Sequence, residues 1–433
     1  MSTQTRDVLE LVRAARGAVS DARARARPAL AWEALQERDA EGQARGARPY
    51  DEEAFDHFTR ANAHDPEDVG VIHHLAIAHH ARAWDWEVAG DRRAAHEWER
   101  ALEHWRAVAA AGAFWDALKA KLRACDDSAD TRLLDEARAA MLEHLLDVHV
   151  DFVRHYCEGG AEERAGAHVQ IVRRARIPPA VKKRLVEKVF EAMTGAVPEA
   201  RAGGEQETAL AALERFLTLF PDHLPALRLH AEVAREWAAR LSYKDDWGGV
   251  LAVAGRAAPH AQRLATHEGL PTSPLAQAAL EELSYELLLK GDDRYDSCAA
   301  ESVAGGGALK RDEARAACEF GLRWGRLAFP VCAPDSRVRR LAARSLNSLA
   351  ISFFEEAREV RESEADYRTK VAALVRILRR AVGLTEEALD CTPENDVLEH
   401  NHKLFRDSLS NYEAEQTEMD LFGAPEGGQE GDS

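Results

Sequence analysis

Residues 72–105 read IHHLAIAHHARAWDWEVAGDRRAAHEWERALEHW, and this stretch decides the fold. Its apolar residues recur every three to four positions in two blocks, which is the period of two amphipathic helices joined by a turn. Several of its large and small residues also match residues 40 positions earlier. The matched pairs are Trp32 and Ile72, Leu35 and Leu75, Ala54 and Ala94, Phe58 and Trp98, and Ala61 and Ala101. The sequence therefore predicts an internal repeat of helical hairpins.

The spacing within one unit resembles the tetratricopeptide repeat. The second half of the unit has small and large residues followed by a proline, at Ala54, Phe58, Ala61 and Pro66. The family's first helix carries large, large, small and aromatic residues, and these places are taken here by Ile72, Leu75, Ala76 and His79. The family's unit is about 34 residues long, so the 40-residue offset indicates a lengthened connection between the helices. The resemblance implies an all-α solenoid of helical hairpins that binds other proteins.

Degenerate copies of the pattern extend along the chain. They occur at Ala209 and Pro221, and again at Leu346, Leu349, Ala350 and Phe353, followed by Ala381, Ala388 and Pro393. Pro198, Gly203 and Gly204 interrupt two periodic segments and indicate a boundary there. We therefore expect an N-terminal helical array over residues 1–197, a C-terminal helical array over residues 205–411, and a tail over residues 412–433.

The composition is that of a water-soluble helical chain. Hydrophobic residues make up 46% of it and charged residues 30%, and Ala and Leu dominate the apolar share. The formal charge of -18 argues against nucleic-acid binding, which needs a clustered basic surface. No stretch approaches the roughly 20 apolar residues of a membrane span, the amphipathic residues 1–21 do not resemble a signal peptide, and the 6 cysteines are widely spaced. We therefore expect reduced thiols, no membrane partner and a cytoplasmic location.

Four histidines, His73, His74, His79 and His80, stand in the run HHLAIAHH. A helix presents two ligands to one metal ion at i and i+3 or i+4, and no two of these histidines have that spacing. His73 and His80 share a face, but they lie about 10.5 Å apart along the helix axis. We therefore expect no metal here. The tetratricopeptide register implies that His73, Ile77 and His80 line a concave groove, while His79 packs inward.

Tryptophans gather next to this helix. The stripe formed by Trp98, Ala101, Leu102, Trp105 and Val108 has helical spacing and is expected to be core. Trp84 and Trp86 flank Asp85 beside the lengthened turn. These two tryptophans are either structural or, in the functional interpretation, join the groove as contacts for a partner.

The strongest basic run surrounds two consecutive prolines at 178 and 179, which mark a helix start. Its members are Arg173, Arg174, Arg176, Lys182, Lys183 and Arg184. A solvated face is one interpretation of this run. The other is a patch that binds an anionic partner segment or the chain's own acidic tail.

The tail over residues 412–433 has seven acidic residues and no Lys or Arg. Such a segment buries little apolar surface, so we expect it to be disordered. Met419, Leu421 and Phe422 form a small apolar island within it. We interpret this island as a short motif that becomes ordered on binding a partner or a neighbouring copy of the chain.

No phosphate loop, dinucleotide fingerprint or catalytic constellation is present in the sequence. We therefore expect no catalytic residues and no cofactor. The leading hypothesis is a non-enzymatic scaffold or adaptor that binds a peptide or helix of a partner protein in its groove. One alternative is a ligand- or peptide-gated regulatory subunit that acts through a separate effector protein. A remote alternative is a metal-dependent enzyme that uses the His73–His80 helix.

Overall fold

The computed structural model describes residues 69–111, 132–243, 246–301 and 307–422, together with residues 55, 58–59, 62–63 and 66–67. The elements in this part of the chain are helices, and no strand occurs in it. This confirms the predicted all-α, helical-repeat class. The chain divides into two compact units, residues 1–193 and residues 194–433. The division lies close to the boundary that the prolines and glycines near residue 200 indicate.

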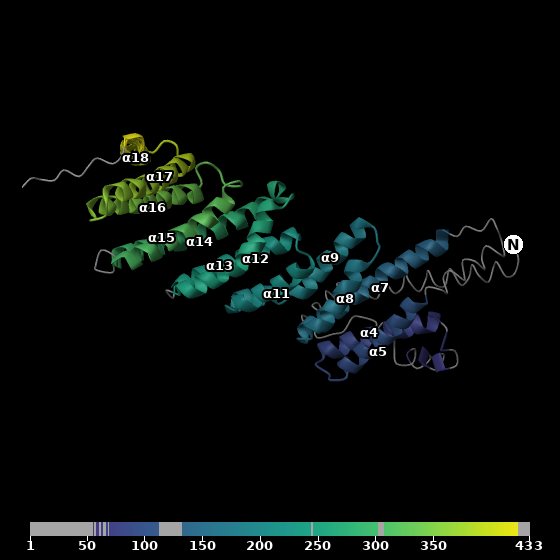
Figure 1. Cartoon of the computed structure of the whole chain (residues 1–433). Helices are drawn as coiled ribbons and strands as arrows, with labels where there is room; N and C mark the ends of the chain where they lie inside the picture. The colour runs from purple at the N-terminus through teal and green to yellow at the C-terminus, as the bar shows by residue number, and fades with distance from the viewer. Residues whose placement is uncertain are drawn as a thin grey trace, which may run out of the picture. The chain divides into compact units, whose positions relative to one another are not determined.

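The first unit is built from helical hairpins (Figure 1). Helix α4 packs on α5, and α7 packs on α8. The bounds are α4 (Val69–Val88), α5 (Ala94–Ala110), α7 (Arg132–Glu158), α8 (Glu162–Arg174) and α9 (Pro179–Thr194). Trp98, Trp105 and Phe152 are each at most 1% exposed, so the predicted tryptophan stripe is core, as expected. Large aromatic side chains therefore fill the space between α4, α5 and α7.

The second unit continues the hairpin pattern with longer helices (Figure 1). Its elements are α10 (Val197–Gly203), α11 (Gln206–Leu219), α12 (Leu224–Tyr243), α13 (Trp247–Thr266), η1 (Leu270–Thr272), α14 (Pro274–Glu301), α15 (Gly307–Ala328), α16 (Arg337–Glu362), α17 (Tyr367–Cys391) and α18 (Asp396–Phe422). Each helix from α11 to α17 packs on the next, and α12 also contacts α14, α14 contacts α16, and α16 contacts α18. Contacts between neighbouring and alternate helices are what a stack of helical hairpins requires.

Local chemistry fixes where the long helices begin. The side chain of Ser336 accepts a hydrogen bond from the backbone N–H of Arg339 at the start of α16. Asp366 does the same for the backbone N–H of Thr369 at the start of α17. Such N-caps satisfy backbone donors that have no partner inside the helix, and each contributes about 1 kcal/mol. The two caps therefore set the register of the hairpin that forms one side of the candidate site.

Helices α14 and α15 approach each other closely at two glycines. A Cβ atom at Gly291 would lie 2.6 Å from the carbonyl oxygen of Ala317 and 2.8 Å from the Cα of Gly321. A side chain at Gly321 would meet the carbonyl oxygen of Leu288 at 2.9 Å. The absence of side chains at these two positions therefore determines how tightly the hairpin closes.

The expected disorder of residues 412–433 is wrong for the first part of that segment. Helix α18 continues to Phe422, and Met419 is 5% exposed within the core of α16, α17 and α18. Tyr412 packs against the same core. Acidic side chains of α18 bind to α17. The Tyr367 hydroxyl donates to Glu415 at 2.6 Å, and Arg379 pairs with Glu413 at 2.8 Å. Residues 423–433 lie outside the described residues.

None of the described helices is long and apolar enough to cross a membrane.

Candidate functional site

The structure corrects the predicted groove on α4. Ile77 and His80 are each only 4% exposed, so neither is available to a partner. The His80 ring lies 5.2 Å from the Trp98 ring of α5 and 6.1 Å from the Phe152 ring of α7. The tetratricopeptide register places this face in a groove, but α5 and α7 both pack against it here. The backbone of His73 is helical, and its side chain lies outside the described residues.

The tryptophans beside this helix have different surroundings. Trp84 is half-buried and donates a hydrogen bond from Nε1 to His80 Nε2 at 3.2 Å, which is a structural role. The Trp86 ring has the Arg82 guanidinium 4.7 Å and the Arg93 guanidinium 4.3 Å from its centroid. Cation–π contacts of this kind hold a half-buried ring in place. A partner contact at Trp86 stays a prediction.

The basic run remains largely on the surface. Five of its residues are exposed (Arg173, Arg174, Arg176, Lys183 and Arg184), whereas Lys182 is half-buried and donates to the carbonyl oxygen of Arg173 at 2.7 Å. Arg173 and Arg174 lie in the last turn of α8, where positive charge is favourable next to the helix dipole. This arrangement is compatible with a solvated face, and binding of an anionic partner there stays a prediction.

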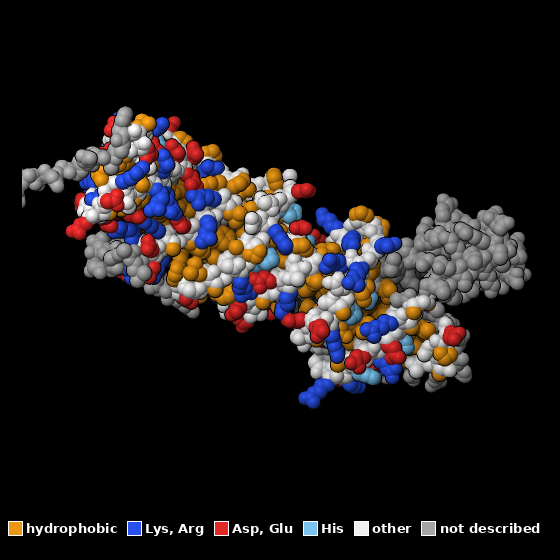
Figure 2. Space-filling view, viewed as in Figure 1, with side chains coloured by type: hydrophobic (Ala, Val, Ile, Leu, Met, Phe, Trp, Pro, Cys, Tyr) orange, Lys and Arg blue, Asp and Glu red, His pale blue; other side chains and the backbone are white. Residues whose placement is uncertain are grey.

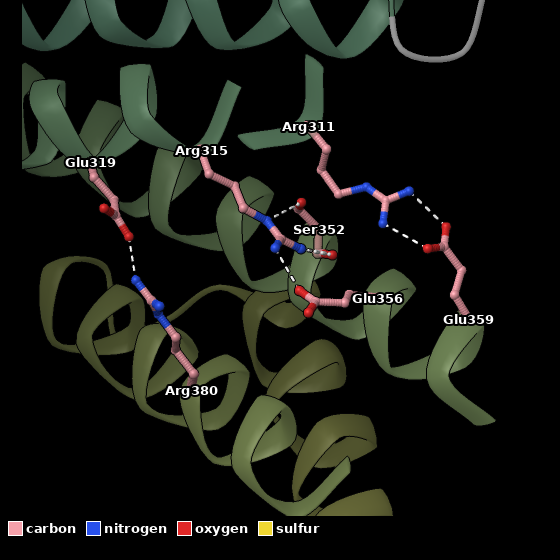
Figure 3. Close-up of polar contacts among 7 residues, drawn as sticks. All are labelled: Arg311, Arg315, Glu319, Ser352, Glu356, Glu359 and Arg380. Atoms are coloured by element: carbon pink, nitrogen blue, oxygen red, sulfur yellow. Dashed lines mark hydrogen bonds and ion pairs between the residues drawn. The ribbon is translucent and has the colours of Figure 1, made fainter. Parts of the chain in front are cut away.

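A more structured surface occurs on α15, α16 and α17. One face of α15 carries charged residues that reach first to α16 and then to α17 (Figure 3). The Arg311 guanidinium forms two hydrogen bonds to Glu359, at 2.6 and 2.8 Å. Further along α15, Glu319 pairs with Arg380 of α17. The long side chains therefore connect α15 to α17 across the middle helix.

Arg315 is the most fixed member of this row. Its guanidinium donates to the Ser352 hydroxyl at 2.9 Å, to the Ser352 carbonyl oxygen at 2.6 Å and to Glu356 at 2.5 Å (Figure 3). It also lies 4.1 Å from the centroid of the Phe353 ring, and the Arg380 guanidinium lies 4.4 Å from the same centroid. The two arginines therefore both contact one buried aromatic ring, which fixes their positions.

A pocket of about 460 Å³ lies beside this row. We call it the arginine pocket, and its lining consists of Glu319, Leu322, Arg323, Arg326, Leu349, Arg380 and Leu384. Leu322 and Leu349 are each 1% exposed and Leu384 is half-buried, so the pocket has an apolar floor contributed by all three helices. The three arginines of the lining are exposed, and Glu319 is half-buried. The pocket therefore combines an apolar base with a charged rim.

The rim is positive overall, because it contains three arginines and one glutamate. Arg326 is paired with Glu387 at 2.5 and 2.7 Å, and hydrogen bonding to that carboxylate raises the pKa of the guanidinium. Arg323 is exposed and has no ion pair with any of the described residues. Figure 2 shows Lys and Arg side chains gathered over α15 to α17. The rim can therefore accept an additional carboxylate without first breaking an existing pair at Arg323.

This pocket is not predictable from the local sequence pattern. Leu349 belongs to a degenerate copy of the repeat, but no local pattern connects that residue with Leu322, Arg323 or Arg380. The signal that does exist in the sequence is the row of charged residues on α15, which recurs every four positions at Arg311, Arg315 and Glu319. Their partners lie 37 to 61 residues away along the chain, which no local pattern reveals.

Three residues of the second unit could hold a metal ion. Glu214, His230 and His260 each offer one ligand atom, and these atoms lie within 4.8 Å of one another. They belong to three successive helices, α11, α12 and α13. No metal site is predicted from the sequence, in which the histidines of the His73–His80 run are the candidate ligands.

Comparisons with known proteins leave the family open. No known protein-family profile matches the chain, and no curated protein sequence matches it. Among solved structures, it aligns with a circular tandem repeat protein described as having a novel repeat topology and enhanced subunit contact surfaces. That alignment has 17% identity and a TM-score of 0.21, and it covers 96% of this chain and 97% of the other.

A second alignment is with a chain in a structure of Naa15/Naa10 bound to HypK-THB, at 13% identity with a TM-score of 0.12. It covers 87% of this chain and 66% of that chain. TM-scores this low do not establish a shared fold. The helical-repeat class therefore rests on the helices and contacts of this chain itself.

Proposed function

We propose that the chain is a non-enzymatic, cytoplasmic scaffold of the tetratricopeptide type, and that its arginine pocket binds an acidic segment of a partner protein. The observation that carries the proposal is the combination of a leucine floor with an arginine rim in which Arg323 has no ion pair among the described residues. Apolar and cationic groups side by side favour a ligand that has both an apolar and an anionic group.

The leucine floor supplies affinity. Burying one large apolar side chain contributes about 1.5–3 kcal/mol, and the pocket volume of about 460 Å³ leaves room for such a side chain. Peptides that bind grooves of helical proteins commonly place their apolar residues in this way, as anchors at helical spacing. The expected partner segment therefore carries Leu or Phe.

The arginine rim supplies selectivity. A guanidinium binds a carboxylate through two parallel hydrogen bonds, which a lysine cannot reproduce. Arg380 and Arg326 are already held in position by Glu319 and Glu387, so fewer side-chain rotamers are lost on binding. A basic segment would meet a rim that is positive overall and includes Arg323, which has no ion pair among the described residues, so its binding would be disfavoured.

The test uses three fluorescein-labelled helical peptides and measures their fluorescence anisotropy with the full chain. The first combines Asp and Glu with a central Leu, the second has Ala in place of Leu, and the third has Lys in place of the acids. We expect the first to bind most tightly, the second at least about tenfold more weakly, and the third not at all. Equal binding of the acidic and basic peptides would contradict the proposal.

Two charge reversals locate the binding site. Arg323→Glu changes the rim arginine that has no ion pair among the described residues. It is expected to weaken binding of the acidic peptide by at least about tenfold, or about 1.4 kcal/mol. Arg406→Glu is the matched control, because Arg406 is an exposed arginine on α18 that does not line the pocket. Both variants change the net charge of the chain by the same amount. Equal weakening by the two variants would show that only the overall charge of the protein matters.

A further inference from the structure

Three ligand-type side chains converge where α11, α12 and α13 pack together. Glu214 comes from α11, His230 from α12 and His260 from α13, and their ligand atoms lie within 4.8 Å of one another. The His230 and His260 rings are 4.5 Å apart between centroids. These residues are 16 and 30 positions apart in sequence, so the packing of the helices alone brings them together.

Two imidazole nitrogens in the cluster have no hydrogen-bond partner among the described residues. His230 is 1% exposed and its Nε2 atom is buried without a partner, and the Nδ1 atom of His260 is in the same situation. Leaving a buried polar atom without a partner costs about 1–3 kcal/mol. Two such atoms on the two histidines of one cluster indicate that a further group belongs there.

The distance between His230 and Glu214 suits a shared metal ion better than a shared proton. His230 Nε2 lies 3.6 Å from Glu214 Oε1, which is too long for a hydrogen bond. Two ligand atoms about 2.1 Å from a tetrahedral zinc ion are separated by roughly 3.4 Å. This pair is therefore already close to the separation that a metal would impose.

Arg256 orients the carboxylate and limits which metal is possible. Its guanidinium donates to Glu214 Oε1 at 2.9 Å and to Oε2 at 2.8 Å, which leaves a second lone pair on each oxygen. Because the arginine offsets the carboxylate charge, a cation must gain its affinity from the imidazole nitrogens. Zn²⁺ and its neighbours in the first transition row bind imidazole, whereas Mg²⁺ and Ca²⁺ require oxygen ligands.

We propose that Glu214, His230 and His260 form a binding site for one divalent transition-metal ion of the zinc class. Three protein ligands leave a coordination position for water. An ion bound here connects three helices, and because it binds only the folded chain it stabilises their packing.

The test begins with the full chain stripped of metal by a chelator and titrated with Co²⁺, which reports its ligands through visible absorption, followed by displacement with Zn²⁺. We expect one cobalt ion per chain, a spectrum of four- or five-coordinate nitrogen and oxygen ligation, and displacement by zinc. Hydrogen exchange in α11, α12 and α13 should slow when zinc is added. Binding of Mg²⁺ with equal affinity, or no cobalt binding, would overturn the proposal.

Variants assign the ligands. His260→Gln changes a half-buried residue and is expected to weaken cobalt binding at least about a hundredfold, whereas His400→Ala, on the exposed surface of α18, should leave it unchanged. Glu214→Gln provides a second ligand variant that keeps the shape of the side chain. Circular dichroism of each variant confirms folding. Unchanged cobalt affinity in folded His260→Gln and Glu214→Gln would show that the metal binds elsewhere.

Discussion

Two regions of the molecule use the same helical-hairpin plan with different side chains. In α4, α5, α7 and α8, the core contains tryptophan, phenylalanine and histidine side chains, and polar groups such as the His80 imidazole are buried. In α14 to α18, the core is largely leucine, valine and alanine, and arginine–glutamate pairs lie on the outside. The first region therefore depends on buried polar contacts and the second on aliphatic packing.

The difference determines which surface is available for binding. His79 and His149 of the first region are committed to partners within the fold, because His79 bonds to Glu97 at 2.7 Å and His149 bonds to His168 at 2.8 Å. The second region keeps Arg323 exposed on the rim of the arginine pocket. Histidines that first suggest a functional site can thus be core, whereas an ordinary Leu and Arg surface carries the candidate binding site.

The largest expected effect is on the aromatic core. Trp98 is 1% exposed, stacks on His155 at 4.6 Å and donates to Glu87 at 3.1 Å. Trp98→Ala should lower the stability of α4, α5 and α7 by about 3–5 kcal/mol, with little change in α14 to α18. Hydrogen exchange with mass spectrometry measures both regions in one sample.

Trp86→Ala is the control for this change, because Trp86 is half-buried and rests on two arginines. Its effect should stay below about 1 kcal/mol. If both tryptophan variants opened α14 to α18 as much as α4 to α7, the two regions would not be energetically distinct.

A smaller effect is expected where α14 meets α15. Gly291→Ala places a methyl group against the Ala317 carbonyl oxygen and should cost about 1–3 kcal/mol, because the backbones must move apart. Gly383→Ala, in α17, meets no atom within 4 Å and should stabilise the chain by about 0.5–1 kcal/mol. Thermal unfolding of the two variants measures the contrast. Destabilisation by Gly383→Ala equal to that by Gly291→Ala would refute the close approach as the cause.

A pH dependence confined to the first region is also expected. His149 and His168 share a contact of 2.8 Å between their Nδ1 atoms, and burial lowers the pKa of His149 to about 4 and that of His168 to about 3. Both values lie below the unfolded value of about 6.5, so the unfolded chain binds more protons at intermediate pH. Stability is therefore full above about pH 6.5 and falls as the pH decreases towards 4, by up to about 1 kcal/mol per pH unit for each histidine.

Hydrogen exchange of α7 and α8 between pH 7 and pH 5, corrected for intrinsic rates, measures this slope. His168→Gln should reduce it, whereas His96→Gln, an exposed position on α5, should not. A slope in α14 to α18 as steep as that in α7 and α8 would contradict the assignment to this histidine pair.

The fold class could be predicted from the sequence because helical periodicity is local. The stripe of Trp98 and Trp105 indicates one buried helix face, and both residues are core. The tail shows the limit of composition as a guide. Its acids suggest disorder, but Phe405, Leu409, Tyr412 and Met419 continue a helical stripe that packs on the core. Periodicity across residue 412 could have predicted the longer helix.

The candidate sites could not be predicted in the same way, because they depend on contacts between distant helices. His80 is buried by α7, whose Phe152 follows 72 positions later in the chain. The arginine pocket combines Arg323 of α15 with Leu349 of α16 and Arg380 of α17. A family register assigns groove positions within one hairpin, and it contains no information about which later helix covers them.

The most direct test of the proposed function is a charge exchange at the arginine pocket. The anisotropy of the acidic and basic leucine peptides would be measured with the unchanged chain and with a variant carrying Arg323→Glu and Arg380→Glu. The unchanged chain should prefer the acidic peptide and the variant the basic one, because the rim changes from positive to negative while the leucine floor remains. An unchanged preference for the acidic peptide in the folded variant would contradict binding at this pocket.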